Sequence, residues 1–320
     1  MNDQRGATLR DYVRIARPDH WIKNLFILPG TLAAAAMLHR GLSCGVCARL
    51  AVALASTCLV ASANYVINEW LDAKFDRFHP TKKNRPVVVA SLRRGLVWAE
   101  WAVLAAAGLA LSLCVGRLFF ASAAWLFVMG LAYNVEPVRT KDVPYLDVLS
   151  ESVNNMIRLL MGWFVVTDSS LPPCSLVLGY WMAGAFLMAT KRFAEYRMIG
   201  DPERAGLYRR SFRLYTESSL LVSSVVYALF SSFLLGAFLV KYRIELLVAM
   251  PFMFALFGKY LAIAYKPDSA AQKPEKLYRE KGLMVLTALF AASILVGGLV
   301  KMPWLGIFTS RDLISLGGVL

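Results

Sequence analysis

The sequence predicts an all-α polytopic membrane protein, a bundle of nine transmembrane helices with a cavity that faces the cytoplasm. Of its 320 residues, 58% are apolar, whereas soluble domains hold roughly 45–50%. The apolar residues gather in runs of about 17–23, the helix length that spans a bilayer core of ~30 Å. The formal net charge of +14 fits this class, because basic residues collect in cytoplasmic loops. We therefore expect no nucleic-acid partner.

The expected spans follow one another without a linker or a convincing internal repeat, so the chain is expected to form a single domain over residues 1–320. The first span is short and contains Pro29 and Gly30, which predicts a bend. The charged N-terminus shows no secretory signal pattern. The nine spans are expected at residues 24–38, 50–68, 96–114, 118–134, 145–166, 174–190, 219–240, 244–264 and 282–300.

The distribution of basic residues sets the expected orientation. If the N-terminus is cytoplasmic, the inner segments (1–23, 69–95, 135–144, 191–218 and 265–281) hold 26 Lys and Arg residues and the outer segments hold seven. This asymmetry predicts a cytoplasmic N-terminus. The inner loops after the second, fourth and sixth spans carry charges of both signs, which predicts an active site at the cytoplasmic face.

Three oxygen-bearing side chains recur every four residues at the end of the second span, in NEWLDAKFD. Asn68, Asp72 and Asp76 would stack on one face of a helix, about 6 Å apart. Such groups repel one another unless they share a cation, and Mg²⁺ is commonly held by one or two carboxylates together with substrate phosphates. We therefore expect a Mg²⁺ site at this stripe, with Glu69 beside it.

A basic block, HPTKKNRP, follows this acidic stripe. Lys82, Lys83 and Arg85 could bind phosphate oxygens. Acids that hold Mg²⁺ beside bases that face oxyanions predict a diphosphate site. The alternative is a solvated loop with surface ion pairs, which the period of four and the position at a span end disfavour.

A second polar stripe opens the fifth span, in YLDVLSESVNNMIRLLMGW. Asp147, Glu151, Asn154 and Arg158 fall near one helix face, and ionisable residues within a span usually face the bundle interior and serve function. We expect this stripe to line a cavity, where it could hold a second Mg²⁺ and the polar part of a substrate. The alternative is an interhelical polar network that only fixes packing.

Further candidate substrate-binding residues lie beside these stripes. They are Lys23 at the first span, Tyr133, Arg139 and Lys141 before the second stripe, and Lys191, Arg192 and Glu195 at the end of the sixth span. The bases Arg209, Arg210 and Arg213 could complete an anion pocket, or could only mark the cytoplasmic side and contact lipid headgroups. The pair Cys44 and Cys47 has no second pair or nearby His, so we expect it to be incidental rather than a zinc site.

These motifs resemble those of the UbiA-type intramembrane prenyltransferases, over most of the chain from RPDHWIKN through the ninth span. The family motif NDxxDxxxD reads NEWLDAKFD here, and its DxxxD motif is matched by DVLSE. The resemblance implies a UbiA-like bundle and a Mg²⁺-dependent transferase. Its metal would be held by Asn68, Asp72 and Asp76 with help from Asp147 and Glu151, and the four carboxylates would be the catalytic residues.

Within the family, the segments RPDHWIKN, HPTKKNRP, YLDV, KRFAE and RRSFRLYT look most like the decaprenyl-phosphate phosphoribosyltransferase branch. That branch implies transfer of 5-phosphoribosyl from phosphoribosyl pyrophosphate (PRPP) to a polyprenyl phosphate, with release of pyrophosphate. It also implies a bacterial inner (plasma) membrane location and a place in cell-envelope polysaccharide biosynthesis. The alternatives are prenyl transfer from a polyprenyl diphosphate to an aromatic or other lipid acceptor, and a membrane carrier of lipids or small molecules.

Overall fold

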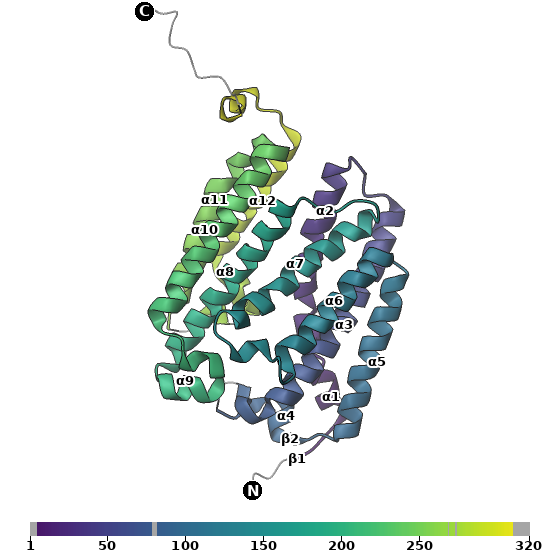
Figure 1. The fold of residues 1–320 in the computed structure, drawn as a ribbon, viewed down its shortest axis with the longest axis vertical. Coiled ribbons are helices and arrows are strands. Elements are labelled where there is room, and N and C mark those ends of the chain that lie inside the picture. Colours follow the sequence, from purple (N-terminus) through teal and green to yellow (C-terminus); the bar gives the residue numbers. More distant parts are fainter. Residues whose placement is uncertain (1–4, 79–81, 268, 273, 310–320) are drawn as a thin grey trace, which may run out of the picture.

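Long helices lie side by side along the molecule and build one bundle (Figure 1). This computed structural model describes residues 5–78, 82–267, 269–272 and 274–309, so His79, Pro80 and Thr81 of the basic block fall outside the described residues. The α-helices are α1 (Leu9–Ile15), α2 (Leu28–Met37), α3 (Cys44–Asp76), α4 (Pro86–Val89), α5 (Arg94–Leu113), α6 (Arg117–Asn134), α7 (Leu146–Val166), α8 (Cys174–Ile199), α9 (Pro202–Tyr208), α10 (Glu217–Tyr242), α11 (Met250–Ala264) and α12 (Lys281–Leu299). The 3-10 helices are η1 (Pro18–Ile27), η2 (Lys82–Asn84), η3 (Thr140–Asp142), η4 (Arg210–Arg213), η5 (Ile244–Ala249), η6 (Ala270–Gln272), η7 (Pro274–Arg279) and η8 (Pro303–Phe308).

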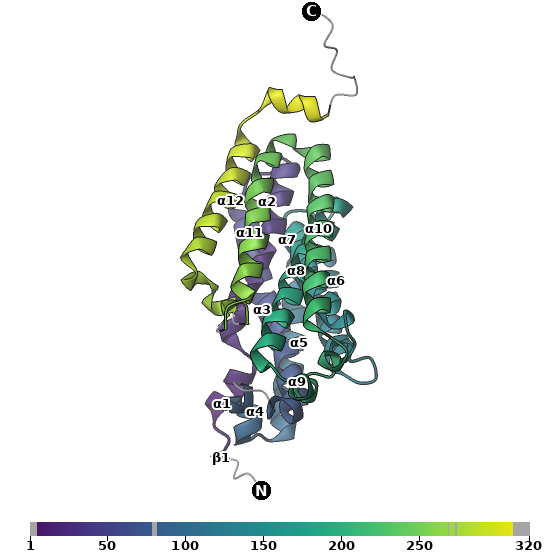
Figure 2. The same ribbon diagram turned by 90° about the vertical axis from the view of Figure 1, so that its left-hand side faces the viewer.

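Seven helices in the described part of the chain are long and apolar enough to cross a membrane: α3, α5, α6, α8, α10, α11 with the preceding η5, and α12. The all-helical membrane class is therefore confirmed. Two of the nine expected spans do not meet this measure. One is α2, which has only ten residues, and the other is α7, which carries Asp147, Glu151 and Arg158. The strand β1 and the helix η8 lie at opposite ends of the molecule (Figure 2).

The helix α7 lies inside the bundle, and 15 of its 21 residues are buried. It packs against α2, α6 and α8. The contact with the first span is made backbone to backbone, because a Cβ atom at Gly30 would lie 1.9 Å from the carbonyl oxygen of Leu159. The first span changes from the 3-10 helix η1 to the α-helix α2 one residue before Pro29.

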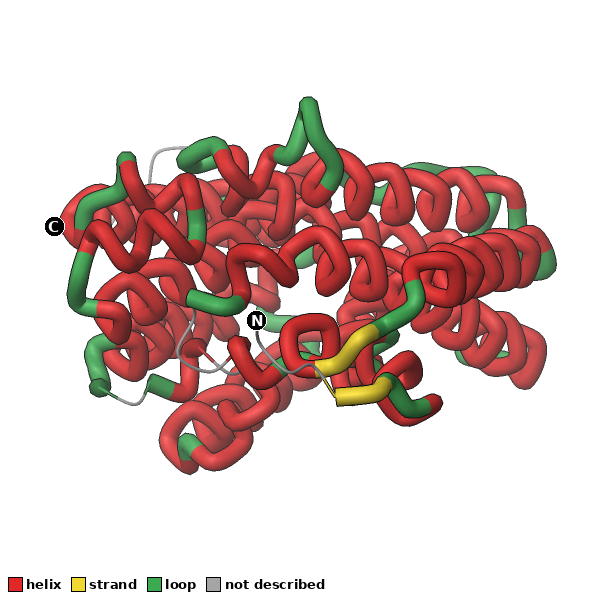
Figure 3. Tube along the Cα trace, turned by 90° about the horizontal axis from the view of Figure 1, so that it is seen from below, coloured by secondary structure: helices red, strands yellow, loops and turns green. Residues whose placement is uncertain are grey.

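The helix α3 continues past its apolar run and carries the whole first acidic motif without a break. The N-terminal segment covers the loop that follows it. Strand β1 (Arg5–Gly6) pairs in parallel with β2 (Ala90–Ser91), as Figure 3 shows at one end of the bundle. Beneath this ladder, Ile15 packs in one apolar cluster with Val66 and Val87. The N-terminus therefore fixes the segment that carries Arg85 relative to α3.

Candidate active site

One cavity of about 750 Å³ lies where the ends of α3, α6 and α8 meet η1 and the middle of α7. Tyr208 of α9 contributes to its lining, and α9 lies at the same end of the bundle as α4 (Figure 1). Apolar side chains such as Phe26 and Leu187 also line it. Its charged and amide side chains are Arg17, Asp19, Lys23, Asn64, Asn68, Asp72, Lys82, Arg85, Asn134, Glu151, Asn154, Asn155, Arg158, Lys191, Arg192, Glu195, Arg209 and Gln272.

Cations outnumber carboxylates on the cavity wall. The lining contains eight Lys and Arg residues but four Asp and Glu residues. His20 also lines the cavity, and its two ring nitrogens contact the neighbouring cations Arg17 and Lys23. An excess of fixed positive charge in a partly buried cavity attracts anionic ligands.

Asp72 is held by two bases from the loop after α6. Its Oδ1 accepts from Nζ of Lys141 at 2.5 Å and from the Arg139 guanidinium at 2.9 Å. Lys141 also donates to Oδ1 of Asn134 at 2.7 Å, and Asn68 donates to the same oxygen at 2.5 Å. Both bases contact Oδ1, whereas no described residue donates a hydrogen bond to the second oxygen of Asp72, which lines the cavity.

Asp76 and Glu69 face a different group of bases. Asp76 is 2% exposed and accepts from Arg85 at 2.8 Å. Glu69 lies 3.4 Å from Arg85 and 3.7 Å from Arg17. Both arginines line the cavity, whereas Asp76 and Glu69 do not. These two carboxylates therefore orient cavity-facing arginines from behind.

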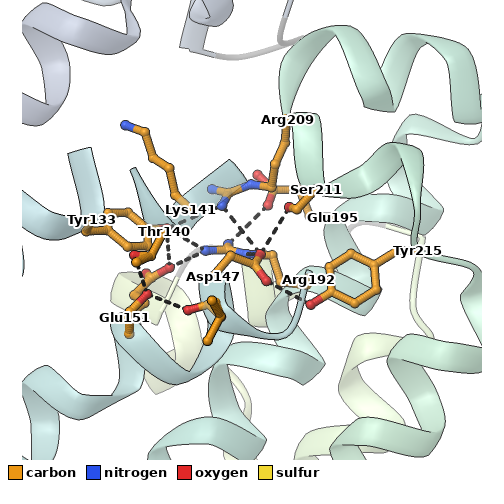
Figure 4. A network of polar contacts seen from close by, with 12 residues as sticks. Tyr133, Thr140, Lys141, Asp147, Glu151, Arg192, Glu195, Arg209, Ser211 and Tyr215 are labelled. Carbon is orange, nitrogen blue, oxygen red and sulfur yellow. Dashed lines mark hydrogen bonds and ion pairs between the residues drawn. The ribbon is translucent and has the colours of Figure 1, made fainter. Parts of the chain in front are cut away.

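A second polar network joins α7 to α8 (Figure 4). Glu151 pairs with Arg192 and accepts from the Tyr133 hydroxyl at 3.0 Å. The same hydroxyl accepts from Arg192 and from Arg209, both at 3.2 Å. Since Glu151, Arg192 and Arg209 all line the cavity, this network presents one carboxylate and two guanidinium groups to it.

Asp147 lies on the far side of this network. Its side chain is fully buried and accepts from the hydroxyls of Tyr215 at 2.7 Å and Ser211 at 3.2 Å. Arg192 lies 3.4 Å away and Arg209 3.6 Å away. Asp147 thus points toward η4 and away from Glu151 in Figure 4, and it does not line the cavity.

Lys82 connects the basic block to the far wall. Its ammonium lies 3.4 Å from Glu195 and contacts the hydroxyl of Tyr208, which itself donates to Glu195 at 3.1 Å. Burial lowers the pKa of Lys82 to about 8, against the attraction of Glu195. Burial also lowers the pKa of Lys141 to about 8, although Asp72 opposes that change.

The oxygen ligands in the cavity fit a Mg²⁺ ion whose coordination shell is completed by substrate oxygens. Within the described ranges, no three His, Cys, Asp or Glu side chains come together as a metal site. The cavity instead receives Asn64, Asn68 and Asp72 from successive turns of α3. Oδ1 of Asn64 is buried and lacks a hydrogen-bond partner among the residues described. Hard oxygens of this kind, with one or two carboxylates and substrate phosphates, suit Mg²⁺.

The structure brings most of the predicted site residues to one cavity. Those that line it are Lys23, Asn68, Asp72, Lys82, Arg85, Tyr133, Glu151, Asn154, Arg158, Lys191, Arg192 and Glu195. Arg139 and Lys141 stand behind Asp72, while Asp76 and Asp147 stand behind arginines. Lys83 is exposed and does not line the cavity.

Several cavity residues were missed or left open, among them Asn64, Tyr208 and Arg209. Asn64 continues the four-residue period of Asn68 and Asp72 by one turn, so the signal was present in the sequence. No sequence motif around Tyr208 predicted that it lines the cavity. The role of Arg209, Arg210 and Arg213 was left open, and Arg209 lines the cavity. Arg210 instead pairs with Asp142 at 3.2 Å, outside the cavity lining.

Comparisons with known proteins agree with this geometry. The profile of the UbiA prenyltransferase family matches residues 26–279. The decaprenyl-phosphate phosphoribosyltransferase of Mycolicibacterium smegmatis is 32% identical over 65% of this chain and 63% of its own length, so the chain matches less than two thirds of that relative. The nodulation protein NoeC of Azorhizobium caulinodans is 32% identical over 68% of each chain.

The fold also matches a solved structure. A UbiA homologue from Archaeoglobus fulgidus, bound to DMAPP and Mg²⁺, superposes with a TM-score of 0.67. The match covers 91% of this chain and all of that one, at 19% sequence identity. At that identity the likeness concerns the fold alone.

Proposed function

The chain belongs to the UbiA prenyltransferase family, and from that premise we propose that it transfers 5-phosphoribosyl from PRPP to a polyprenyl phosphate. The family assignment makes the chain a transferase, so the carrier alternative is set aside. The name of the M. smegmatis relative supports the transfer of a phosphoribosyl group to this class of acceptor. The product would serve cell-envelope polysaccharide biosynthesis.

The observation that carries the proposal is the excess of cations on the cavity wall, eight against four carboxylates. A prenyl diphosphate brings one cluster of phosphate charge to such a site. PRPP brings a diphosphate at C1 and a separate phosphate at C5, and the lipid acceptor brings a third anionic group. A wall with cations on η1, η2, α7 and α8 suits several phosphate groups better than one.

In the proposed reaction, the bond between C1 of the ribose and the diphosphate oxygen breaks, and that oxygen keeps the electron pair. A phosphate oxygen of the lipid then bonds to C1. Mg²⁺, when bound, would neutralise charge on the departing pyrophosphate. Asn68 and Asp72 would hold it, with Asn64 as a further oxygen donor.

The protein's own bases complete the charge balance. We assign Lys82, Arg85 and Arg17 to the diphosphate, because all three line the cavity and Arg85 is held by Asp76, one helical turn after Asp72. Preorganised cations of this kind stabilise charge that grows on a leaving group. Asp76 and Asp147 were predicted as metal ligands; their positions favour a different role, in which they position arginines that face the cavity.

We propose nine membrane crossings with the N-terminus and the cavity mouth on the cytoplasmic side of a bacterial inner membrane. Besides the seven apolar helices, η1 with α2 would provide the first crossing and α7 the fifth. The charges of α7 do not argue against a crossing, because Asp147 and Arg158 are buried in the bundle. The bias of Lys and Arg toward the proposed inner loops supports the orientation.

The runner-up is prenyl transfer from a polyprenyl diphosphate to an aromatic or other lipid acceptor, favoured by the fold it shares with the DMAPP-bound homologue. A donor test separates the two. Purified protein in detergent with Mg²⁺ receives ribose-labelled PRPP with polyprenyl phosphate in one tube, and a labelled prenyl diphosphate with candidate aromatic acids in another. Label that moves from PRPP into the lipid phase supports the proposal, and product in the second tube alone overturns it.

A further inference from the structure

A buried guanidinium lies beside the cavity without a carboxylate to balance it. Arg158 is on α7 and is 7% exposed. Its Nε donates to Oδ1 of Asn24 at 3.0 Å, and one terminal nitrogen donates to the backbone oxygen of Asn154 at 3.1 Å. Among the residues that the structure describes, no Asp or Glu forms an ion pair with it, whereas Arg85 and Arg192 each contact a carboxylate.

A charge in this position is costly unless something pairs with it. A guanidinium has five N–H donors, and the hydrogen bonds that Arg158 makes to described residues use two of them. Arg158 lines the cavity, so the remaining donors have access to a ligand there. Asn155 and Tyr65 line the cavity as well.

The orientation of Arg158 is fixed by neutral partners. Asn24 accepts from Arg158 and donates to Sγ of Cys58 at 3.1 Å, which holds the amide in place. Asn154, whose backbone oxygen accepts from Arg158, has a buried side-chain Oδ1 without a hydrogen-bond partner within the described part of the chain. A preorganised fork of this kind matches two oxygens of one phosphate group.

We propose that Arg158 binds a phosphate monoester, in an anion subsite separate from the diphosphate end at Asp72. Arg158 follows Glu151 by seven residues on α7, so it lies roughly 10 Å further along the helix axis. This proposal rests on the proposed function, which supplies two phosphate monoesters: the 5-phosphate of the donor and the phosphate of the lipid acceptor.

Direct binding tests the subsite without requiring turnover. The probes are ribose 5-phosphate, for the donor end, and farnesyl phosphate, for the acceptor lipid. Both are titrated into wild type, Arg158→Gln and Lys259→Gln in detergent, with tryptophan fluorescence as the readout. Lys259 is the matched control, since it is a cation within a membrane helix that does not line the cavity.

We expect Arg158→Gln to raise the Kd of one probe by about 10- to 100-fold, as for a lost charge-assisted hydrogen bond. The probe that loses affinity identifies the source of the phosphate. Lys259→Gln should bind both probes like wild type. Unchanged affinity for both probes in Arg158→Gln overturns the proposal and makes Arg158 a packing residue only.

A second variant guards against misfolding. Arg158→Lys keeps the charge but loses the planar fork, so its Kd for the affected probe should rise by roughly 5- to 10-fold. Size-exclusion profile and melting temperature report folding, and wild-type affinity for both probes in either folded variant overturns the subsite. If wild type fails to move label from PRPP while Arg158→Gln still loses phosphate affinity, the phosphoribosyl function is wrong and the subsite stands.

Discussion

Lys141 donates to Oδ1 of Asp72 at 2.5 Å and so ties the loop after α6 to the first acidic motif. Arg139 from the same loop contacts that oxygen at 2.9 Å. The two bases balance the carboxylate through one oxygen, and no residue in the described ranges donates a hydrogen bond to the other. Asp72 is therefore oriented toward the cavity, and it is the carboxylate of the first motif that lines the cavity.

Asp72→Asn should lower kcat by at least about 100-fold, because it removes the charge that holds the metal and opposes the cationic wall. Asp76→Asn should lower kcat by only roughly 10-fold, since Asp76 acts through Arg85. Steady-state kinetics on both variants, after size-exclusion shows that they fold, makes the comparison. Equal losses in the two variants would mean that both carboxylates contact the metal.

Asp147→Asn should destabilise the protein strongly. Asp147 is fully buried and faces two arginines and two hydroxyls. Removing one carboxylate from a buried ion-pair network costs about 3–5 kcal/mol, although Arg192 keeps its contact with Glu151. Ser211→Ala is the matched control and should cost about 1 kcal/mol, for one hydrogen bond. Denaturant titration in mixed micelles measures both, and a loss for Asp147→Asn no larger than for the control would refute the positioning role.

The affinity for pyrophosphate should fall as pH rises from 7 to 9. The pKa of Lys82 is lowered by burial to about 8, so its ammonium loses its proton in this range and with it a charge-assisted contact, worth roughly 10-fold in affinity. Binding of Mg-pyrophosphate across the range is the measurement. Lys82→Arg should keep its affinity to higher pH, and the exposed neighbour variant Lys83→Gln should follow wild type. A parallel fall in Lys82→Arg would assign the titration to another group.

The free energy of unfolding should rise with pH over the range in which the affinity for pyrophosphate falls. Lys82 has a pKa of about 8 in the folded chain against an ordinary value of 10.5. Folding therefore releases a proton between these values, and this group's contribution to the free energy of unfolding is largest above pH 10.5 and is lost as pH falls through 8. Unfolding titrations of wild type and Lys82→Met between pH 7 and 10 measure this contribution. The free energy of unfolding of wild type, relative to that of Lys82→Met, should fall as pH falls from 10 to 7, and a rise would contradict the lowered pKa.

Gly30→Ala should destabilise the crossing of the first span and α7. The added Cβ would lie 1.9 Å from the Leu159 carbonyl oxygen, and backbone atoms cannot move aside as a flexible side chain can. Overpacking of this kind costs about 1–3 kcal/mol or more. Gly298→Ala is the control, because a Cβ there meets nothing within 4 Å. Melting temperatures of the two variants should differ clearly, and similar values would contradict the close crossing.

The helices could be predicted because each apolar run has the length of a membrane helix. The expected spans at 96–114 and 118–134 lie within one or two residues of α5 and α6. What the runs could not show is the distinction between a helix that faces lipid and one that is buried inside the bundle. The helix α7 is polar for a membrane helix because it faces its neighbours and the cavity.

Periodicity located the first motif but not all of the second. Spacing on one helix predicts which side chains share a face, yet it says nothing of partners from distant segments. Asp147 was expected beside Glu151 at a metal, but Arg192 and Tyr215, which are 45 and 68 residues away in sequence, surround it. The pairing of β1 with β2 escaped prediction for the same reason, since each strand has only two residues.

The most direct test of the account is pyrophosphate release from PRPP labelled in its diphosphate, with purified protein in detergent and Mg²⁺. Wild type should release label only when polyprenyl phosphate is present, at one pyrophosphate per phosphoribosyl lipid formed. Chelation of the metal or Asp72→Asn should abolish the release. Release from a prenyl diphosphate with an aromatic or other lipid acceptor, and none from PRPP, would contradict the account and identify a prenyltransferase.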